Sequence, residues 1–247
     1  GYPTGALLTE TLYRDGDISK EQAQRIMKFN VCGGAGFIIT AVGTVTLSSQ
    51  KSGLLLFSSN VLAALCLTGC TAIGQTKDHK IITGTAAPLP VGEALSVSAT
   101  EGIKSLLNIT AYIVLFSAFD GIINIPPIIK PVFEITSGIC TGTALSLPQT
   151  AAYLAFGGFC IHLQLIGMIK TFDMKYIDFL LCRIFHAALS YGICYGLLQL
   201  FPQDTAVFSN VSDTIARPSI VNTALSVLLL FGCIVLIFDL QAKRRKV

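Results

Sequence analysis

The sequence contains little charge. Asp, Glu, Lys and Arg make up 13% of its 247 residues, whereas hydrophobic residues make up 52%. A soluble domain carries about 25% charged residues. The composition and a mean hydropathy of +0.69 therefore exclude an ordinary soluble domain and predict an integral membrane protein in contact with membrane lipid. The small formal charge of +3 gives no reason to expect a nucleic-acid partner.

Tryptophan is absent, so no tryptophan belt marks where the spans meet the membrane surfaces. The enzyme motifs H-E-x-x-H, G-x-S-x-G and G-x-x-x-x-G-K-[ST] are absent as well. The three histidines are too dispersed for a metal site. The eight cysteines include no C-x-x-C pair and are expected to behave as small hydrophobic residues. The sequence thus predicts no enzyme, no metal site and no cofactor.

Apolar runs predict about six transmembrane helices. They lie at about 31–48, 53–75, 105–124, 150–169, 179–200 and 220–240. The predicted fold class is an all-α polytopic membrane protein, with broken or re-entrant segments between the spans and an inverted-repeat architecture. Before the first span, residues 18–29 predict an amphipathic helix at the surface, with Ser19 as its N-cap.

The segment 131–142 (PVFEITSGICTG) interrupts one of the most apolar parts of the chain. Nearby prolines and glycines exclude an ordinary spanning helix. Glu134 lies there between bulky apolar neighbours, and an ionisable residue at membrane depth is a functional-site hypothesis. We predict a half-helix that enters the membrane and leaves again, with Glu134, Thr136 and Ser137 at its polar tip. The alternative is an interfacial loop whose glutamate faces water.

The two halves of the chain show a weak internal similarity. GYPTGALLTETL is followed by the glycine-rich span FNVCGGAGFIITAVG, and FEITSGICTGTALSL is followed by AFGGFCIHLQLIGM. The two glycine-rich spans are expected to run in opposite directions, which is typical of inverted-topology repeats whose broken segments meet near the membrane centre. Residues 1–10 and 128–142 are therefore predicted to be broken or re-entrant and to approach each other across a pseudo-twofold axis.

Basic residues predict the orientation in the membrane. The positive-inside rule places the KRRK tail in the cytoplasm, and the other cytoplasmic segments are then 1–30, 76–104 and 170–183. With the tail, these segments hold 14 of the 17 Lys and Arg residues. We expect a multi-pass protein of the cell (inner) membrane, with both ends of this sequence cytoplasmic and 201–219 outside.

Five motifs in the same order resemble one family. They are G-Y-P-T-G-A-x-L-T, ISKEQAQRI, FIIxxVG, FEITSG and AFGGFxIHxQ, and together they extend from residue 1 to about 195. They are similar to the YlbJ-type sporulation integral membrane proteins, which carry a nucleoside-recognition (gate) domain. The resemblance implies a bacterial inner-membrane protein linked to sporulation. It also implies a distant relation to concentrative nucleoside transporters and to the gate regions of ferrous-iron transporters.

The resemblance also implies a division of the chain. Residues 1–75 are expected to be the C-terminal part of a first gate-type repeat, 76–104 a cytoplasmic connector, and 105–200 a second gate-type repeat. Residues 201–247 are expected to supply an extracytoplasmic loop, the final span and the basic tail. Because the sequence begins with Gly1 rather than Met, directly in a motif, further N-terminal spans are expected to precede it.

The family's motifs imply candidate binding residues at three places. The G-x-P-x-G motif, the F-E-I-T-x-G motif and the polar face of the later glycine-rich span supply them. The candidate solute-binding residues are Gly1, Pro3, Gly5, Glu134, Thr136, Ser137, His162 and Gln164. Residues 31–35 read VCGGA where relatives often have polar residues and a proline, so the first-half site is left without an assigned ligand.

His162 and Gln164 are two residues apart on the predicted helix, so they point about 200° apart. For His162, a hydrogen-bonded packing role is preferred to ligand binding. For Gln164, a cavity-lining role and a packing role stay equally open.

The sequence leaves two candidate functions. The first is a permease-like carrier of a small polar, nucleoside-like solute, with Glu134 in a midplane site. The second is a non-transporting membrane protein that acts by assembly in spore morphogenesis. Besides lipid, the candidate partners are the solute, a coupling ion and a second copy of the chain.

Overall fold

The computed structural model describes residues 1–72, 90–140 and 145–201, together with six positions between 227 and 235. Every regular element in these ranges is helical. The elements with assigned bounds are α1 (Tyr2–Arg14), α2 (Lys20–Asn30), η1 (Gly36–Thr46), α3 (Gln50–Ala72), α4 (Val91–Ile123), α5 (Lys130–Phe133), α6 (Ile135–Cys140), α7 (Leu147–Phe156), α8 (Gly158–Met168) and α9 (Tyr176–Leu200). The predicted all-α membrane class is confirmed. The predicted loop 201–219, the final span, the basic tail and residues 76–89 lie almost wholly outside the described residues.

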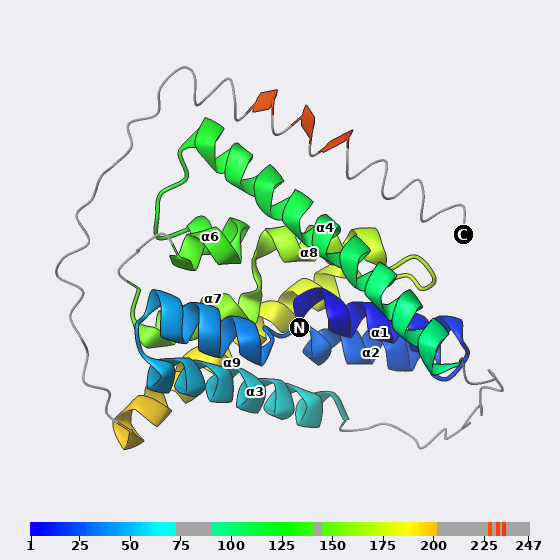
Figure 1. The fold of residues 1–247 in the computed structure, drawn as a ribbon. Coiled ribbons are helices and arrows are strands. Elements are labelled where there is room, and N and C mark those ends of the chain that lie inside the picture. Colours follow the sequence, from blue (N-terminus) through cyan, green and yellow to red (C-terminus); the bar gives the residue numbers. More distant parts are fainter. Residues whose placement is uncertain (73–89, 141–144, 202–226, 229–230, 233, 236–247) are drawn as a thin grey trace.

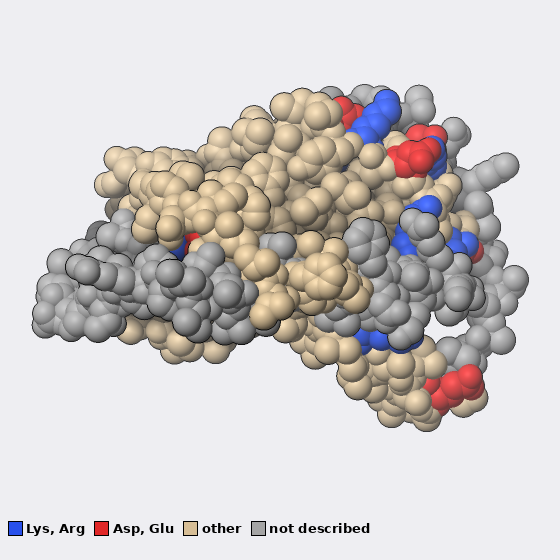
Figure 2. Space-filling model, turned by 90° about the horizontal axis from the view of Figure 1, so that it is seen from above, with Lys and Arg blue, Asp and Glu red and all other residues tan. Residues whose placement is uncertain are grey.

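Within the described residues, four segments are long and apolar enough to cross a membrane. They are Gln50–Ala72, Val91–Ile123, Leu147–Met168 and Tyr176–Leu200, and they correspond to the second to fifth predicted spans. Their outer faces expose large hydrophobic side chains, such as Leu65 of α3, Leu106 of α4 and Leu181 of α9. Figure 2 shows uncharged side chains over the broad middle of one face and charged ones gathered mainly toward one end. This distribution is the one expected of a protein surrounded by lipid.

The fourth predicted span is two half-helices rather than one. α7 ends at Gly157, which has a φ of +88°, and α8 begins at Gly158, which has a φ of +76°. Glycine adopts this left-handed conformation without the strain that a Cβ causes. The consecutive glycines therefore interrupt the helix in the interior of the protein.

The first predicted span, 31–48, does not form a full-length helix. Residues 31–34 are non-helical, and η1 is a π-helix of 11 residues. The hydroxyls of Thr44 and Thr46 donate to carbonyls five residues earlier, in keeping with the wide turn. A Cβ on Gly43 would lie 2.8 Å from the amide nitrogen of Gly53, so η1 and α3 approach more closely than side chains allow. The non-helical residues 31–34 thus shorten this element, and glycine allows it to pack closely against α3.

Residues 1–10 were predicted to be broken or re-entrant, and the first of these alternatives is wrong, because α1 is continuous over 13 residues. Pro3 lies in its first turn, where the missing N–H of proline removes no helical hydrogen bond. At about 20 Å, the helix is nevertheless too short to cross a bilayer core of about 30 Å. α2 confirms the predicted amphipathic helix, with Ser19 and Gln22 forming a capping box, although Met27 on its inner face is buried.

The predicted connector 76–104 is helical from Val91 onward, and this helix continues into the third span without interruption. α4 has 33 residues and is about 50 Å long, which exceeds the thickness of the bilayer core. Figure 1 shows it crossing one face of the molecule diagonally. Only Ala111, Tyr112 and Ala118 of α4 are buried, so its N-terminal part packs little against the rest of the described chain.

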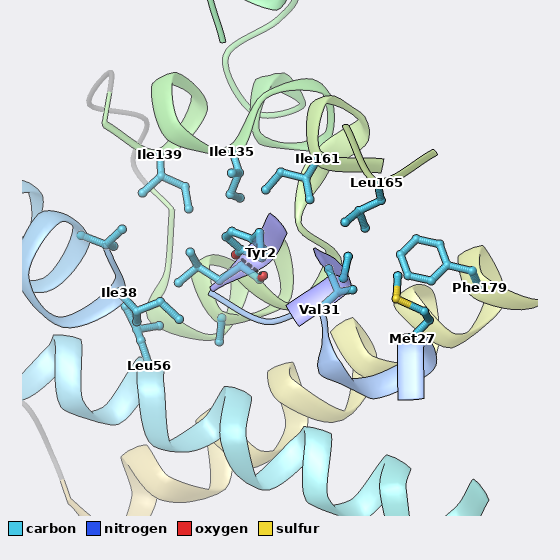
Figure 3. Packing of buried hydrophobic residues seen from close by; sticks show 14 of the residues in the cluster. Tyr2, Met27, Val31, Ile38, Leu56, Ile135, Ile139, Ile161, Leu165 and Phe179 are labelled. Atoms are coloured by element: carbon cyan, nitrogen blue, oxygen red, sulfur yellow. Dashed lines mark hydrogen bonds between the residues drawn. The ribbon is translucent and has the colours of Figure 1, made fainter. Parts of the chain in front are cut away.

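The core is built around the start of α1. Tyr2 is 7% exposed and donates a hydrogen bond of 2.6 Å from its hydroxyl to the carbonyl oxygen of Leu154. Figure 3 shows Tyr2 between Ile135 and Ile161 of the second half and Ile38 of the first. The N-terminal motif and the broken segment around Glu134 therefore share one core, as their predicted approach requires.

Contacts between the two halves come in exchanged pairs. α2 packs on α9 and α3 packs on α7; α1 packs on α8 and η1 packs on α6. Suppose that α1, α2, η1 and α3 of the first half correspond, in this order, to α6, α7, α8 and α9 of the second. A twofold rotation then converts the α2–α9 contact into the α3–α7 contact, and the α1–α8 contact into the η1–α6 contact. Both α2 and α7 also begin with a Ser–Gln capping box and end near a phenylalanine. Phe29 follows Ser19 by ten positions, and Phe156 follows Ser146 by the same number. These pairs fit the predicted inverted repeat.

Candidate functional site at two helix interruptions

Glu134 lies between α5 and α6 and is 4% exposed. Its carboxylate accepts hydrogen bonds from the backbone N–H groups of Thr136 (2.7 Å) and Ser137 (2.5 Å). The side chain therefore caps the first turn of α6, where a negative charge interacts favourably with the helix dipole. Glu134 is buried as predicted, and the alternative of a glutamate that faces water is wrong.

Thr136 and Ser137 contribute their amides to this cap, and their side chains are partly exposed. A carboxylate has about four lone-pair positions on its two oxygens. The two amides occupy one position on each oxygen of Glu134. The carboxylate keeps the capacity to accept further hydrogen bonds without giving up the cap.

The interruption at Gly157–Gly158 packs directly against the one at Glu134. A Cβ on Gly158 would lie 3.1 Å from the carbonyl oxygen of Pro131 and 3.3 Å from both the amide nitrogen of Ile135 and the carbonyl oxygen of Phe133. Only glycine combines this close approach with a left-handed backbone. Two breaks in helical hydrogen bonding therefore meet in the interior.

The G-x-P-x-G motif lies beside the third interruption, at residues 31–34. The Cα of Gly1 is 3.6 Å from the place where Gly34 would carry a Cβ, and a Cβ on Gly5 would lie 2.6 Å from the carbonyl oxygen of Asn30. Asn30 in turn donates from its amide to the carbonyl oxygen of Gly5 at 2.9 Å. Gly1 is exposed and Pro3 is partly buried. These residues hold α1 against the interruption.

His162 is buried, and both of its ring nitrogens have partners. Nδ1 lies 3.2 Å from the hydroxyl of Tyr176, and Nε2 lies 3.1 Å from the carbonyl oxygen of Phe156. The rings of Phe156, Phe159 and Phe179 surround it, with centroids at 4.8, 5.7 and 5.1 Å. This geometry favours the packing role that was preferred on sequence grounds.

Gln164 is 2% exposed and donates from Nε2 to the sulfur of Cys160 at 3.4 Å. Cys160 packs with Ala111 and Tyr112 of α4, whereas His162 faces α9. The two polar residues of α8 therefore point in different directions, as their spacing predicts. Of the two, Gln164 is the one with a weak hydrogen-bond acceptor as its partner.

Sequence reasoning missed a polar cluster between α3, α7 and α9. Asn60 donates from Nδ2 to the carbonyl oxygen of Ala151 at 3.4 Å, and Ser190 donates to the same oxygen at 3.2 Å. Nε2 of His186 lies 3.1 Å from the carbonyl oxygen of Asn60. Oδ1 of Asn60 and Nδ1 of His186 are buried without a hydrogen-bond partner in the described structure. This cluster lies inside the protein among three candidate spans.

Arg183 was predicted among the basic residues of a cytoplasmic segment, and the structure places it inside the protein, fully buried on α9. Its guanidinium donates to the carbonyl oxygens of Lys28 and Val31. These groups belong to the end of α2, where carbonyls lack intrahelical partners. Within the described ranges, no Asp or Glu forms a salt bridge with Arg183, and its Nε has no partner.

A signal for this second polar set was present in the sequence. Arg183, His186 and Ser190 follow a spacing of three and four residues, which places them on one face of a helix. Arg183 stands seven residues inside the helix that begins at Tyr176. Because Arg183 lies close to the predicted start of the span, at residue 179, it was assigned to the segment that precedes the span.

Comparison with curated proteins finds a relative that covers most of the chain. The chain is 24% identical, over 258 aligned residues and 83% of its length, to the sporulation integral membrane protein YlbJ of Bacillus subtilis (strain 168). The chain is thus similar to a YlbJ-type sporulation protein. The match spans 62% of that relative's length. No family model matches the chain, and no solved structure does.

The similarity confirms the resemblance that the motifs predicted, and it agrees with four apolar helices in identifying a membrane protein. The nucleoside-recognition domain, the inner-membrane location and the cytoplasmic ends stay predictions.

Proposed function

We propose that this chain forms part of a permease-like carrier for a small polar solute in a bacterial inner membrane. One observation carries the proposal: the interruptions at Glu134 and at Gly157–Gly158 are packed against each other in the interior. Interrupted helices at membrane depth occur where protein or a cavity satisfies their backbone. Carriers built from inverted repeats bind their solutes at such places, because free helix ends supply oriented polar groups.

In this proposal, Glu134 orients the tip of α6 and accepts hydrogen bonds from hydroxyl or amine groups of the solute. Thr136 and Ser137 supply hydroxyls beside it, and Gln164 supplies an amide from α8. His162 supports the wall of the site through its contacts with α9. No residue is assigned a catalytic role, and no cofactor is required. The name of the relative supports a role of this carrier in sporulation.

A nucleoside-like solute is tested directly with the full-length protein in proteoliposomes. We expect uptake of at least one member of a panel of radiolabelled nucleosides, and we expect it to depend on pH or on a sodium gradient. Glu134→Gln keeps one carbonyl oxygen for the α6 cap but removes the charge, so uptake should fall at least tenfold while the helical circular dichroism is retained. Glu134→Ala removes the cap as well.

The matched control is Glu101→Gln, which makes the same chemical change at a side chain that is 46% exposed on α4. It should leave uptake unchanged. Uptake that survives both changes at Glu134 would assign the residue to structure alone. If the wild-type protein takes up no member of the panel, a nucleoside-like solute is excluded, and the assembly alternative gains support.

A further inference from the structure

The two halves of the chain are joined at one end by what we term the hairpin seam. It consists of the α1–α2 hairpin of the first half and the loop 169–175 between α8 and α9 of the second. Glu10 of α1 is 8% exposed. Both of its carboxylate oxygens accept the amide of Lys170 at 3.2 Å, and one of them accepts the amide of Thr171 at 3.2 Å. A buried carboxylate of one half thus holds the backbone of the other.

Further contacts surround this one. Lys20 forms a salt bridge of 2.9 Å with Asp173, and Gln24 donates to the carbonyl oxygen of Asp173 at 2.6 Å. The rings of Tyr13 and Phe172 meet edge to face, with centroids 5.4 Å apart. The hydrogen bond that Lys20 donates to Asp173 raises the pKa of Lys20. Every one of these contacts joins the first half to the second.

The hairpin seam lies beside the buried guanidinium of Arg183. A cavity of about 70 Å³ opens on it, lined by Gln24, Met27, Lys28, Met174, Lys175, Asp178 and Phe179. The backbone carbonyl oxygen of Lys28 accepts a hydrogen bond from Arg183, and the ring centroid of Phe179 lies 5.6 Å from the guanidinium carbon of Arg183. Met27 and Phe179 are 0% and 1% exposed and lie side by side in Figure 3. Phe179 also packs against His162 of the proposed solute site, with ring centroids 5.1 Å apart.

The pseudo-twofold axis relates this seam to a contact that the structure describes only in part, because residues 141–144 lie outside the described residues. It joins η1 to α6. In the described parts of these two elements, its side-chain hydrogen bond runs from Thr46 to the sulfur of Cys140 at 3.3 Å. A thiol is a weak acceptor. The hairpin seam, by comparison, is held by a buried carboxylate, a salt bridge and an aromatic pair.

We propose that the hairpin seam is a gate that closes the solute site from this end, and that Glu10 is its latch. The inference rests on the proposed carrier function. Charge-assisted hydrogen bonds are about twice as strong as neutral ones, whereas exposed salt bridges contribute little. Opening the seam then requires release of the amides of Lys170 and Thr171. Movement of one repeat against the other is how such carriers expose a fixed site alternately to each side.

The test uses the absence of tryptophan from the sequence. Phe172→Trp introduces a single reporter at a seam position that is 5% exposed. In this background we compare Glu10→Ala and Glu10→Gln. With the latch removed, the acrylamide quenching constant should at least double and the emission should shift to longer wavelength, with the smaller effect for Glu10→Gln, which keeps one acceptor.

The matched control is Glu21→Gln in the same hairpin, because Glu21 is exposed and accepts a hydrogen bond from the hydroxyl of Ser19 on its own helix rather than from the other half. It should leave both signals unchanged. Quenching that is the same with and without the Glu10 carboxylate would overturn the latch. This measurement needs no transport, so it separates failure of the latch from failure of the proposed function. If the Glu10→Ala variant does not insert into the membrane, the latch is tested by comparing the quenching of Glu10→Gln with that of Glu21→Gln.

A second arm tests the gate itself. Cysteines replace Lys20 and Asp173, which face each other across the seam, and a short thiol-reactive cross-linker with a cleavable disulfide joins them. Uridine uptake into proteoliposomes should fall at least tenfold on cross-linking and return on reduction. Uptake that continues through a cross-linked seam would overturn the gate. A seam that opens in a protein without uptake would instead refute the carrier function.

Discussion

In the part of the chain that the structure describes, the buried charges of Glu10, Glu134 and Arg183 are held by backbone groups rather than by opposite charges. Glu134 accepts the amides of Thr136 and Ser137, and Glu10 accepts those of Lys170 and Thr171. Arg183 does the converse and donates to two carbonyl oxygens at the end of α2. Broken helices supply these unpaired groups. An interrupted helix and a buried charge therefore stabilise each other, which explains why both occur together here.

Gly158→Ala tests the contact between the two interruptions. Alanine would carry a Cβ at a φ of +76°, and that atom would lie 3.1 Å from the carbonyl oxygen of Pro131. A strained backbone conformation costs about 1–3 kcal/mol, and the close backbone neighbours cannot move aside as a side chain does. We expect the free energy of unfolding in detergent micelles to fall by at least about 1 kcal/mol.

Gly192→Ala is the control for that measurement. Gly192 lies within α9, and its added Cβ would meet no heavy atom within 4 Å. The change should be neutral or slightly stabilising, because alanine favours a helix by about 1 kcal/mol over glycine. Equal effects of the two substitutions would show that the interruptions are not packed as described.

Residue-level prediction succeeded where the local sequence carries the whole signal. Ser19 was predicted as an N-cap from its neighbours, and Glu134 as a buried residue from the bulky apolar residues beside it. Arg183 was misplaced, because its partners at Lys28 and Val31 are more than 150 positions away. A single sequence does not show which distant backbone group receives a buried charge.

At the scale of elements, uniform apolar runs were predicted well and glycine-rich ones poorly. α3 and α9 correspond to predicted spans, within a few residues at each end. The predicted spans 31–48 and 150–169 are interrupted or shortened in the structure. A glycine pair is tolerated in a straight helix unless another segment packs against it, and here α1 and the Glu134 segment do. Tertiary contact therefore decided the local structure.

Arg183→Met tests how the interruption at 31–34 is maintained. The substitution keeps much of the volume but leaves the carbonyl oxygens of Lys28 and Val31 without their donor. An unsatisfied buried acceptor costs about 1–3 kcal/mol. We expect faster hydrogen–deuterium exchange at residues 28–38, with smaller changes in α3, and a lower thermal midpoint. Arg183→Lys should recover only part of the loss, because an ammonium lacks the planar fork of a guanidinium.

The control for Arg183 is Arg14→Met. Arg14 has a side chain that is 63% exposed, and it forms a salt bridge with its neighbour Asp15. This change should leave exchange at residues 28–38 at the wild-type rate. Unaltered exchange there in Arg183→Met would contradict the proposed role of the guanidinium.

At the scale of the whole molecule, the orientation rests on the distribution of basic residues. Burial of Arg183 removes one residue from the predicted cytoplasmic set and leaves the asymmetry of the other Lys and Arg residues in place. The salt bridge between Lys20 and Asp173 brings the α1–α2 hairpin and the loop 169–175 to the same end. Both segments were predicted to be cytoplasmic, so the fold and the charge pattern agree on which segments share a side.

Two introduced cysteines test that orientation. Figure 1 places the α1–α2 turn and the start of α3 at opposite ends of the molecule. Asp17 and Lys51 are exposed at these two places. If basic segments stay in the cytoplasm, a membrane-impermeant maleimide should label Lys51→Cys in intact cells and Asp17→Cys only after permeabilisation, each above the signal of the parent. The reverse pattern would invert the topology. Labelling of both from outside would contradict the fold itself, because the first half would then not separate its two ends across the membrane.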